Sequence, residues 1–267
     1  MRNEKLRALF GFVWGLLLFL GVAWLLRLGL GSTVLSSAVI SQIVLKTVLI
    51  LVALAGWKVL GRPFVEMGWR RAEWWKRWYL IWFGIAAASM MAGSMAGILL
   101  EFRHPIASQM SFLQIVLAIW LLSSCSEEVY VRGLVQSWMA DGSGAKDPAQ
   151  MLDRELDGVQ PRAADSHDAK GVTSAFSPSI VSSALLFAGM HVSLLWSPAG
   201  VIGGLTIVLS TLGVGWACAV LRARSHSLWP AIACHIFGNV AGLPGGILGV
   251  ILYRVVYGRL PEFLMPG

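Results

Sequence analysis

The sequence predicts an all-α polytopic membrane protein. Its 267 residues are 57% hydrophobic and only 13% charged, and the mean hydropathy is +0.70, far from the composition of a soluble domain. Several apolar stretches are long enough to cross a bilayer as helices. Lysines and arginines gather in alternate loops between them, as the positive-inside rule expects. The net charge of +7 is therefore explained by membrane topology, and we expect no nucleic-acid partner.

The apolar stretches predict about eight transmembrane helices. In chain order, these are expected at about 9–30, 37–60, 79–100, 112–140, 178–196, 201–221, 228–243 and 247–257. The first stretch is too long for a signal-peptide core and lacks a convincing cleavage site, so we expect a retained helix with a cytoplasmic N-terminus. Pro244, Gly245 and Gly246 predict a tight turn between the last two helices. Arg254 and Arg259 then favour a cytoplasmic C-terminus.

The segments between the helices are polar or aromatic. The loop after the second helix is rich in arginine, so it is expected in the cytoplasm, and its tryptophans are expected at headgroup level; they are Trp69, Trp74, Trp75 and Trp78. Residues 141–177 hold few large apolar side chains and predict a solvated cytoplasmic loop, in which His167 is expected to be exposed. The cysteines, Cys125, Cys218 and Cys234, all lie in apolar stretches and form neither a disulfide framework nor a CxxC pattern.

Three ionisable residues interrupt the apolar run 112–140. They are Glu127, Glu128 and Arg132, and each costs at least a few kcal/mol near a bilayer centre. Glu128 and Arg132 are four residues apart and can form an ion pair on one helix face. Glu127 points about 100° away, so this spacing predicts an unpaired carboxylate that can act as a general base or acid. The alternative, given equal weight, is that all three residues only lock neighbouring helices together.

Two histidine motifs lie in other predicted helices. Phe187 and His191 share one helix face, and so do His235 and Asn239. Measured from the predicted cytoplasmic ends, these residues and Glu127 could meet about 10–20 Å below the membrane surface. There Glu127 and His191 could activate a water for hydrolysis, with His235 and Asn239 donating to the oxyanion. Alternatively, Glu127, His191 and His235 could bind a divalent metal such as zinc.

The three motifs together resemble those of a protease family. EEVYVR at 127–132, FAGMH at 187–191 and HIFGN at 235–239 are similar to the EExxxR, FxxxH and HxxxN motifs of the CPBP intramembrane proteases, also called the Abi or CAAX-protease family. The motifs occur in the family's order, and the similarity covers roughly 112–242. The resemblance implies a four-helix catalytic core and a relation to the Ras-converting CAAX endopeptidases.

The resemblance also implies a role for each motif residue. The position matching Glu127 is the base, and that matching His191 acts on the nucleophilic water. Positions matching His235 and Asn239 belong to the oxyanion side. The family has been described both as metalloproteases and as glutamate-dependent proteases, so it leaves the metal open. The resemblance further implies that three other positions support or line the site: Glu128, Arg132 and Phe187.

Together these observations predict an intramembrane endopeptidase of a prokaryotic plasma membrane, cutting a membrane-associated protein or peptide near the cytoplasmic face. Residues 1–110 are expected to form three N-terminal transmembrane helices, 111–257 the protease core with loop 141–177, and 258–267 a cytoplasmic tail. The expected partners are membrane lipid and the protein or peptide substrate.

Two alternatives belong to other classes of protein. One is a non-catalytic immunity or scaffold protein of the same fold, although retention of every motif residue argues against it. The other is a proton-coupled transporter, in which buried Glu and His residues form a relay, but no pair of related halves is visible. Arg27 and Lys46 also lie within predicted helices, where we expect them to snorkel or to pair locally.

Overall fold

The computed structural model describes residues 2–34, 38–72, 77–102, 109–140, 174–196 and 200–264, and these parts are helical without a β-strand. The predicted all-α membrane fold is confirmed. The single helices are α1 (Arg2–Val34), α2 (Ala38–Val59), α3 (Arg77–Leu99), α9 (Pro178–Gly189), α10 (Gly200–Ser225) and α11 (Leu228–Tyr257). Short 3₁₀ turns are η4 (Val192–Trp196) and η5 (Glu262–Leu264).

Residues 112–140 form one further continuous helix with alternating geometry. Its segments are α4 (Phe112–Gln114), η2 (Ile115–Ser123), α5 (Ser124–Glu128), η3 (Val129–Gln136) and α6 (Ser137–Ala140), of which η2 and η3 are π-helical. At its start, Ser111 accepts a hydrogen bond from the backbone of Gln114, whose side chain bonds back to Ser111. This reciprocal cap satisfies backbone groups that would otherwise be unpaired at a helix N-terminus.

Within the described parts, six helices are long and apolar enough to cross a membrane, and α9 is a shorter apolar helix. The predicted count of about eight is not confirmed for two reasons. The predicted span 178–196 contains only the 12-residue helix α9 (Pro178–Gly189), and the predicted turn at 244–246 is wrong, because α11 is one helix of 30 residues with Pro244 inside it. Proline and glycine are tolerated in membrane helices where neighbouring helices pack closely. Here a Cβ on Gly245 would lie only 2.5 Å from the Cα of Met91 in α3, so this glycine permits close packing of the two helices.

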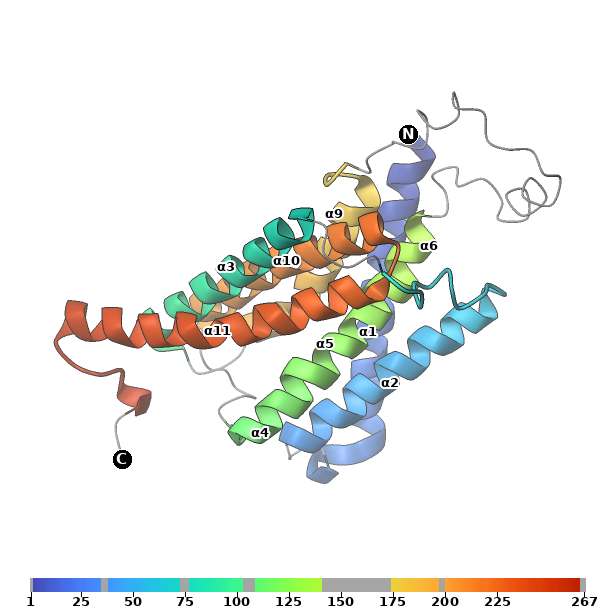
Figure 1. The fold of residues 1–267 in the computed structure, drawn as a ribbon. Helices are drawn as coiled ribbons and strands as arrows, with labels where there is room; N and C mark the ends of the chain where they lie inside the picture. Colours follow the sequence, from blue (N-terminus) through green and yellow to red (C-terminus); the bar gives the residue numbers. More distant parts are fainter. Residues whose placement is uncertain are drawn as a thin grey trace.

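The continuity of α11 separates its two ends by about 45 Å. Figure 1 shows the two termini of the chain at opposite ends of the molecule. The cytoplasmic position of both termini stays a prediction.

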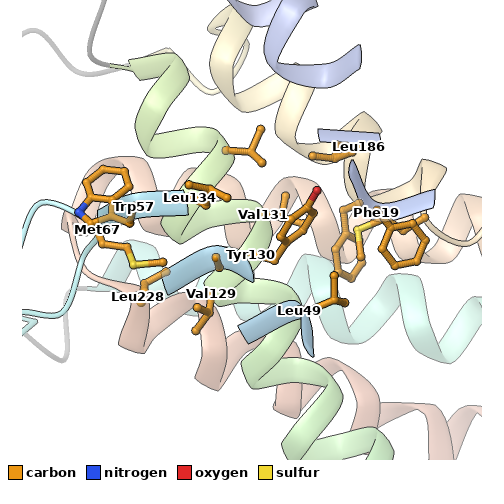
Figure 2. Packing of buried hydrophobic residues seen from close by; sticks show 14 of the residues in the cluster. Phe19, Leu49, Trp57, Met67, Val129, Tyr130, Val131, Leu134, Leu186 and Leu228 are labelled. Carbon is orange, nitrogen blue, oxygen red and sulfur yellow. The ribbon is translucent and has the colours of Figure 1, made fainter. Parts of the chain in front are cut away.

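The helices form two groups that meet at α9. Figure 1 shows α3, α10 and α11 side by side, and α1 and α2 beside the 112–140 helix. The apolar face of the 112–140 helix is buried against α1, α2 and α9, as Figure 2 shows for Tyr130, Val131 and Leu134. The Tyr130 hydroxyl donates to the backbone oxygen of Gly15 in α1 at 2.5 Å. This packing fixes the helix that carries the acidic motif.

Other predictions concern loops and cysteines. Trp69 packs edge-on against Trp229, whereas Trp74 and Trp75 lie outside the described residues, as do His167 and nearly all of loop 141–177. The cysteines are free, as expected: Cys218 and Cys234 are buried, and Cys125 is half-buried.

Candidate active site

The two adjacent glutamates lie on α5, between the two π-helical segments. Glu127 is 3% exposed and Glu128 is fully buried. π-Helical turns are rare and frequently occur at functional sites. Because consecutive residues of a helix point about 100° apart, the two carboxylates pair with different basic side chains, Lys46 and Arg132.

Glu128 forms the predicted ion pair with Arg132. The Arg132 Nε lies 3.3 Å from Oε2 of Glu128, and both side chains are fully buried. The Arg132 guanidinium also donates to the backbone oxygen of Gly215 in α10, and it lies 4.8 Å from the ring centroid of Phe187 in α9. Arg132 therefore joins the 112–140 helix to two neighbouring helices, α9 and α10, and also neutralises Glu128.

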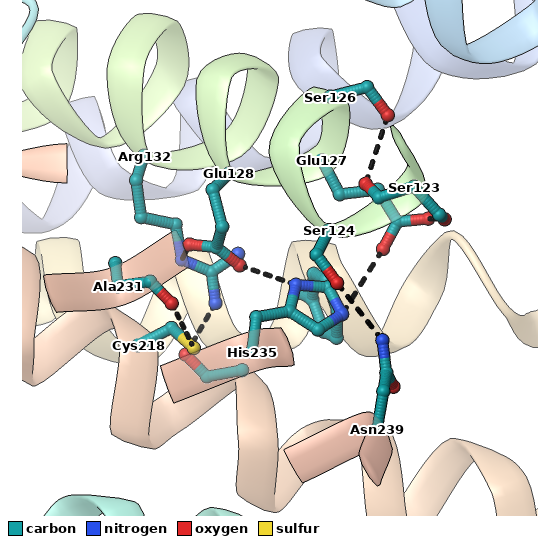
Figure 3. Close-up of polar contacts among 12 residues, drawn as sticks. Ser123, Ser124, Ser126, Glu127, Glu128, Arg132, Cys218, Ala231, His235 and Asn239 are labelled. Carbon is teal, nitrogen blue, oxygen red and sulfur yellow. Dashed lines mark hydrogen bonds and ion pairs between the residues drawn. The ribbon is translucent and has the colours of Figure 1, made fainter. Parts of the chain in front are cut away.

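His235 of α11 lies between the two glutamates (Figure 3). Its Nδ1 is 3.0 Å from Oε1 of Glu128, and its Nε2 is 3.8 Å from Oε2 of Glu127. An ionised carboxylate can only accept a hydrogen bond, so Nδ1 carries a proton and donates it to Glu128. The Phe187 ring packs edge-on against the imidazole, with 5.1 Å between centroids. These contacts fix both the orientation and the tautomer of His235.

The expectation that Glu127 is unpaired is wrong. Lys46 of α2 forms an ion pair with Oε1 of Glu127, and the Ser123 hydroxyl donates to the same oxygen at 2.7 Å. Lys46 was expected to snorkel or to pair locally, yet its partner is 81 residues away in the sequence. The sequence did contain a signal for this ion pair, namely a lysine within a 21-residue apolar span. A buried charge in a membrane helix requires a partner.

A cavity of about 180 Å³ opens beside Glu127. Its lining combines polar and apolar side chains: Phe19, Gln42, Leu45, Lys46, Ile119, Ser123, Glu127, Met190, His191, Ser193 and Leu194. Nδ1 of His191 lies 2.9 Å from the carbonyl oxygen of Phe187, which can only accept. In the neutral imidazole of His191, the proton is therefore on Nδ1, and Nε2 is a hydrogen-bond acceptor. The cavity thus holds two groups that can accept hydrogens from one water.

Asn239 lies one helical turn beyond His235 on α11. Its Nδ2 donates to the Ser124 hydroxyl at 3.0 Å, and Figure 3 shows the side chain directed toward α5. In the described part of the chain, its hydrogen-bond partner is Ser124 rather than Glu127 or His191. The structure therefore brings Glu127 and His191 to one cavity and places His235 against both glutamates. It holds Asn239 beside the same short helix.

Comparison with known proteins identifies the family. Residues 109–241 match the family model described as type II CAAX prenyl endopeptidase Rce1-like. The chain belongs to the CPBP/CAAX protease family. Searches of curated proteins and of solved structures returned no match. Membership supports a protease function in an integral membrane protein, and all three motifs of this CPBP protein lie within the matched residues.

Membership of the CPBP family leaves open whether a metal takes part, and the donor set of the site bears on this question. Among the residues that the structure describes, no group of three His, Cys, Asp or Glu side chains could hold a metal ion. In the expected set of Glu127, His191 and His235, one glutamate oxygen is paired with the Lys46 ammonium. A cation at this carboxylate would meet a like charge. The arrangement does not fit a metal centre.

Proposed function

We propose that this CPBP protein is an intramembrane endopeptidase that hydrolyses a peptide bond of a membrane-associated protein or peptide. The observation that carries the proposal is the cavity shared by Glu127 and His191, two residues of the family-matched part of the chain. A buried carboxylate beside an imidazole acceptor is an arrangement suited to general-base activation of water.

In the proposed reaction, one water lies in the cavity between Glu127 and His191. Oε1 of Glu127 already accepts from Lys46 and Ser123, so Oε2 is the oxygen that takes a proton from the water. Nε2 of His191 accepts the second hydrogen and orients the water. The water oxygen attacks the carbonyl carbon of the substrate. When the C–N bond breaks, the proton held by Glu127 passes to the leaving amine.

The developing oxyanion requires hydrogen-bond donors, which we assign to His235 and Asn239. Because Nδ1–H of His235 is donated to Glu128, Nε2 can donate to an oxyanion only when the ring carries both protons. The Asn239 amide has two N–H bonds: one is donated to Ser124, and the second can reach a substrate oxygen. Fixed donors of this kind stabilise negative charge that appears only in the transition state.

The charges of the site also bear on the substrate. While the ring of His235 is neutral, the Lys46–Glu127 and Arg132–Glu128 pairs are each balanced, so an ionised substrate side chain would enter a site whose charges are already paired. Burying such a charge is costly. We therefore propose that the residues flanking the cleaved bond are uncharged. We further propose that cleavage occurs near the cytoplasmic face of a prokaryotic plasma membrane.

The test compares wild type with Glu127→Gln, both purified into lipid nanodiscs. The probes are quenched-fluorescence peptides with apolar residues at the bond to be cut. One set ends in a prenylated CAAX sequence, because the matching family model is described as a CAAX prenyl endopeptidase. A second set has the same sequences without the prenyl group. Peptides released from cell membranes are compared by mass spectrometry, so that a substrate outside these sets is also found.

We expect Glu127→Gln to lower cleavage at least about 100-fold, because general-base catalysis contributes about 10²–10⁴-fold. Glu262→Gln is the matched control, since Glu262 is exposed and its ion pair with Arg259 lies at the surface. It should cleave like wild type. Cleavage by Glu127→Gln at the wild-type rate would refute the proposal.

A further inference from the structure

Lys46 is a buried ammonium inside an apolar membrane helix. It is 6% exposed and lies within the candidate span Val39–Val59, whose mean hydropathy is 2.2. A charge at such a position costs at least a few kcal/mol and generally serves a function. Lys46 also lies outside the family-matched residues 109–241, so the family match assigns it no role.

The ammonium of Lys46 contacts one carboxylate oxygen of Glu127. Its Nζ pairs with Oε1 of Glu127, and Ser123 donates to the same oxygen at 2.7 Å. Oε2 instead faces Nε2 of His235 at 3.8 Å, beyond direct hydrogen-bonding distance. The two donors therefore hold one carboxylate oxygen and direct the other toward the reacting groups.

Helix α2 contributes further residues to the same cavity. Gln42 lies one turn before Lys46 on α2, and Leu45 precedes it directly. Both line the cavity, as does Phe19 of α1. The N-terminal helices, expected as a unit separate from the protease core, thus form one wall of the candidate active site.

We propose that Lys46 is a positioning residue for Glu127. Its ammonium keeps the buried carboxylate ionised and fixes Oε1, so that Oε2 can take the proton of the attacking water. This inference rests on the proposed function. It adds that Glu127, in the family-matched residues 109–241, needs a charged side chain from α2 to hold it in place.

The first experiment measures kcat and KM on the quenched peptide that wild type cleaves best. Lys46→Met removes the charge while retaining the length of the side chain, and Lys46→Arg retains the charge. Lys58→Met is the matched control, because Lys58 is an exposed lysine in the last turn of the same helix.

We expect Lys46→Met to lower kcat about 30-fold, equivalent to about 2 kcal/mol, while KM changes less than about threefold. Lys46→Arg should recover part of the lost kcat, and Lys58→Met should resemble wild type. A kcat for Lys46→Met within about threefold of that of Lys58→Met overturns the proposal. A raised KM with unchanged kcat also overturns it, because uniform substrate binding would then have been lost.

The second experiment requires no substrate. Thermal unfolding in nanodiscs is measured for wild type, Lys46→Met, Glu127→Gln and the double variant. Each single change leaves one buried polar group without its charged partner, so each should lower Tm by at least about 3 °C, and the double variant should lose less than either single variant. Additive losses overturn the inferred pair. If wild type cleaves no peptide, the proposed function fails, whereas this cycle still decides whether Lys46 holds Glu127.

Discussion

Replacing Gly245 by alanine should destabilise the protein by forcing α3 and α11 apart. An added Cβ at this position would lie 2.5 Å from the Cα of Met91 and 2.8 Å from its carbonyl carbon. Non-bonded carbons normally approach to about 3.5–4.0 Å, so the two backbones must separate by about 1 Å. The contact involves backbone atoms, and no change of rotamer can relieve it.

The expected cost follows from two opposing effects. Overpacking of a well-packed interface costs about 1–3 kcal/mol, whereas alanine gains about 1 kcal/mol over glycine in helix propensity. The contact is with backbone atoms, so the overpacking cost falls in the upper part of this range, about 2–3 kcal/mol. We expect a net loss of about 1–2 kcal/mol, which lowers Tm by about 2–8 °C at 2–4 °C per kcal/mol for a chain of this size. Gly246→Ala is the matched control, because a Cβ there would meet nothing within 4 Å.

The assay is thermal unfolding of both variants and wild type in the same lipid nanodiscs. Gly246→Ala should match wild type or exceed it slightly, because alanine favours the helix. If both substitutions lowered Tm equally, the segment would behave as a turn, and the reasoning from helix packing would be refuted. If neither lowered it, α3 and α11 would not be in close contact at Gly245.

Two further predictions concern the site. Arg132→Met should sharply reduce the amount of folded protein, because it leaves the fully buried Glu128 without its guanidinium partner at a cost of about 3–5 kcal/mol. Adding Glu128→Gln to this variant should restore part of the lost Tm. A double variant with a Tm no higher than that of Arg132→Met would contradict the ion pair. Treatment with EDTA should change cleavage less than about twofold, since the donor set does not fit a metal centre. Loss of cleavage that is restored by added zinc would refute this interpretation.

Helices predicted from the sequence alone match the structure where an apolar run of membrane-spanning length decides the outcome. The helix at 112–140 and the second helix are examples, with α2 at Ala38–Val59 against an expected 37–60. The last helix was mispredicted because Pro-Gly-Gly is a turn signal only where the backbone can bond to water. In α11, Gly245 of this triplet packs against the backbone of Met91 in α3, and close packing favours a continuous helix.

The sequence by itself determined the contacts that depend on helical spacing. Glu128 and Arg132 are four residues apart, and their ion pair follows from one turn of helix. The three motifs likewise pointed to the family that the match at 109–241 identifies.

Only the tertiary structure decided which partners Glu127 meets. Lys46 lies 81 residues away on another helix, and helical periodicity within one segment carries no information about which face of a second helix will be opposite. The packing of α2 against the acidic helix sets that pairing. As a result, Glu127 is not a free carboxylate: Lys46 holds its Oε1, and its Oε2 faces His235.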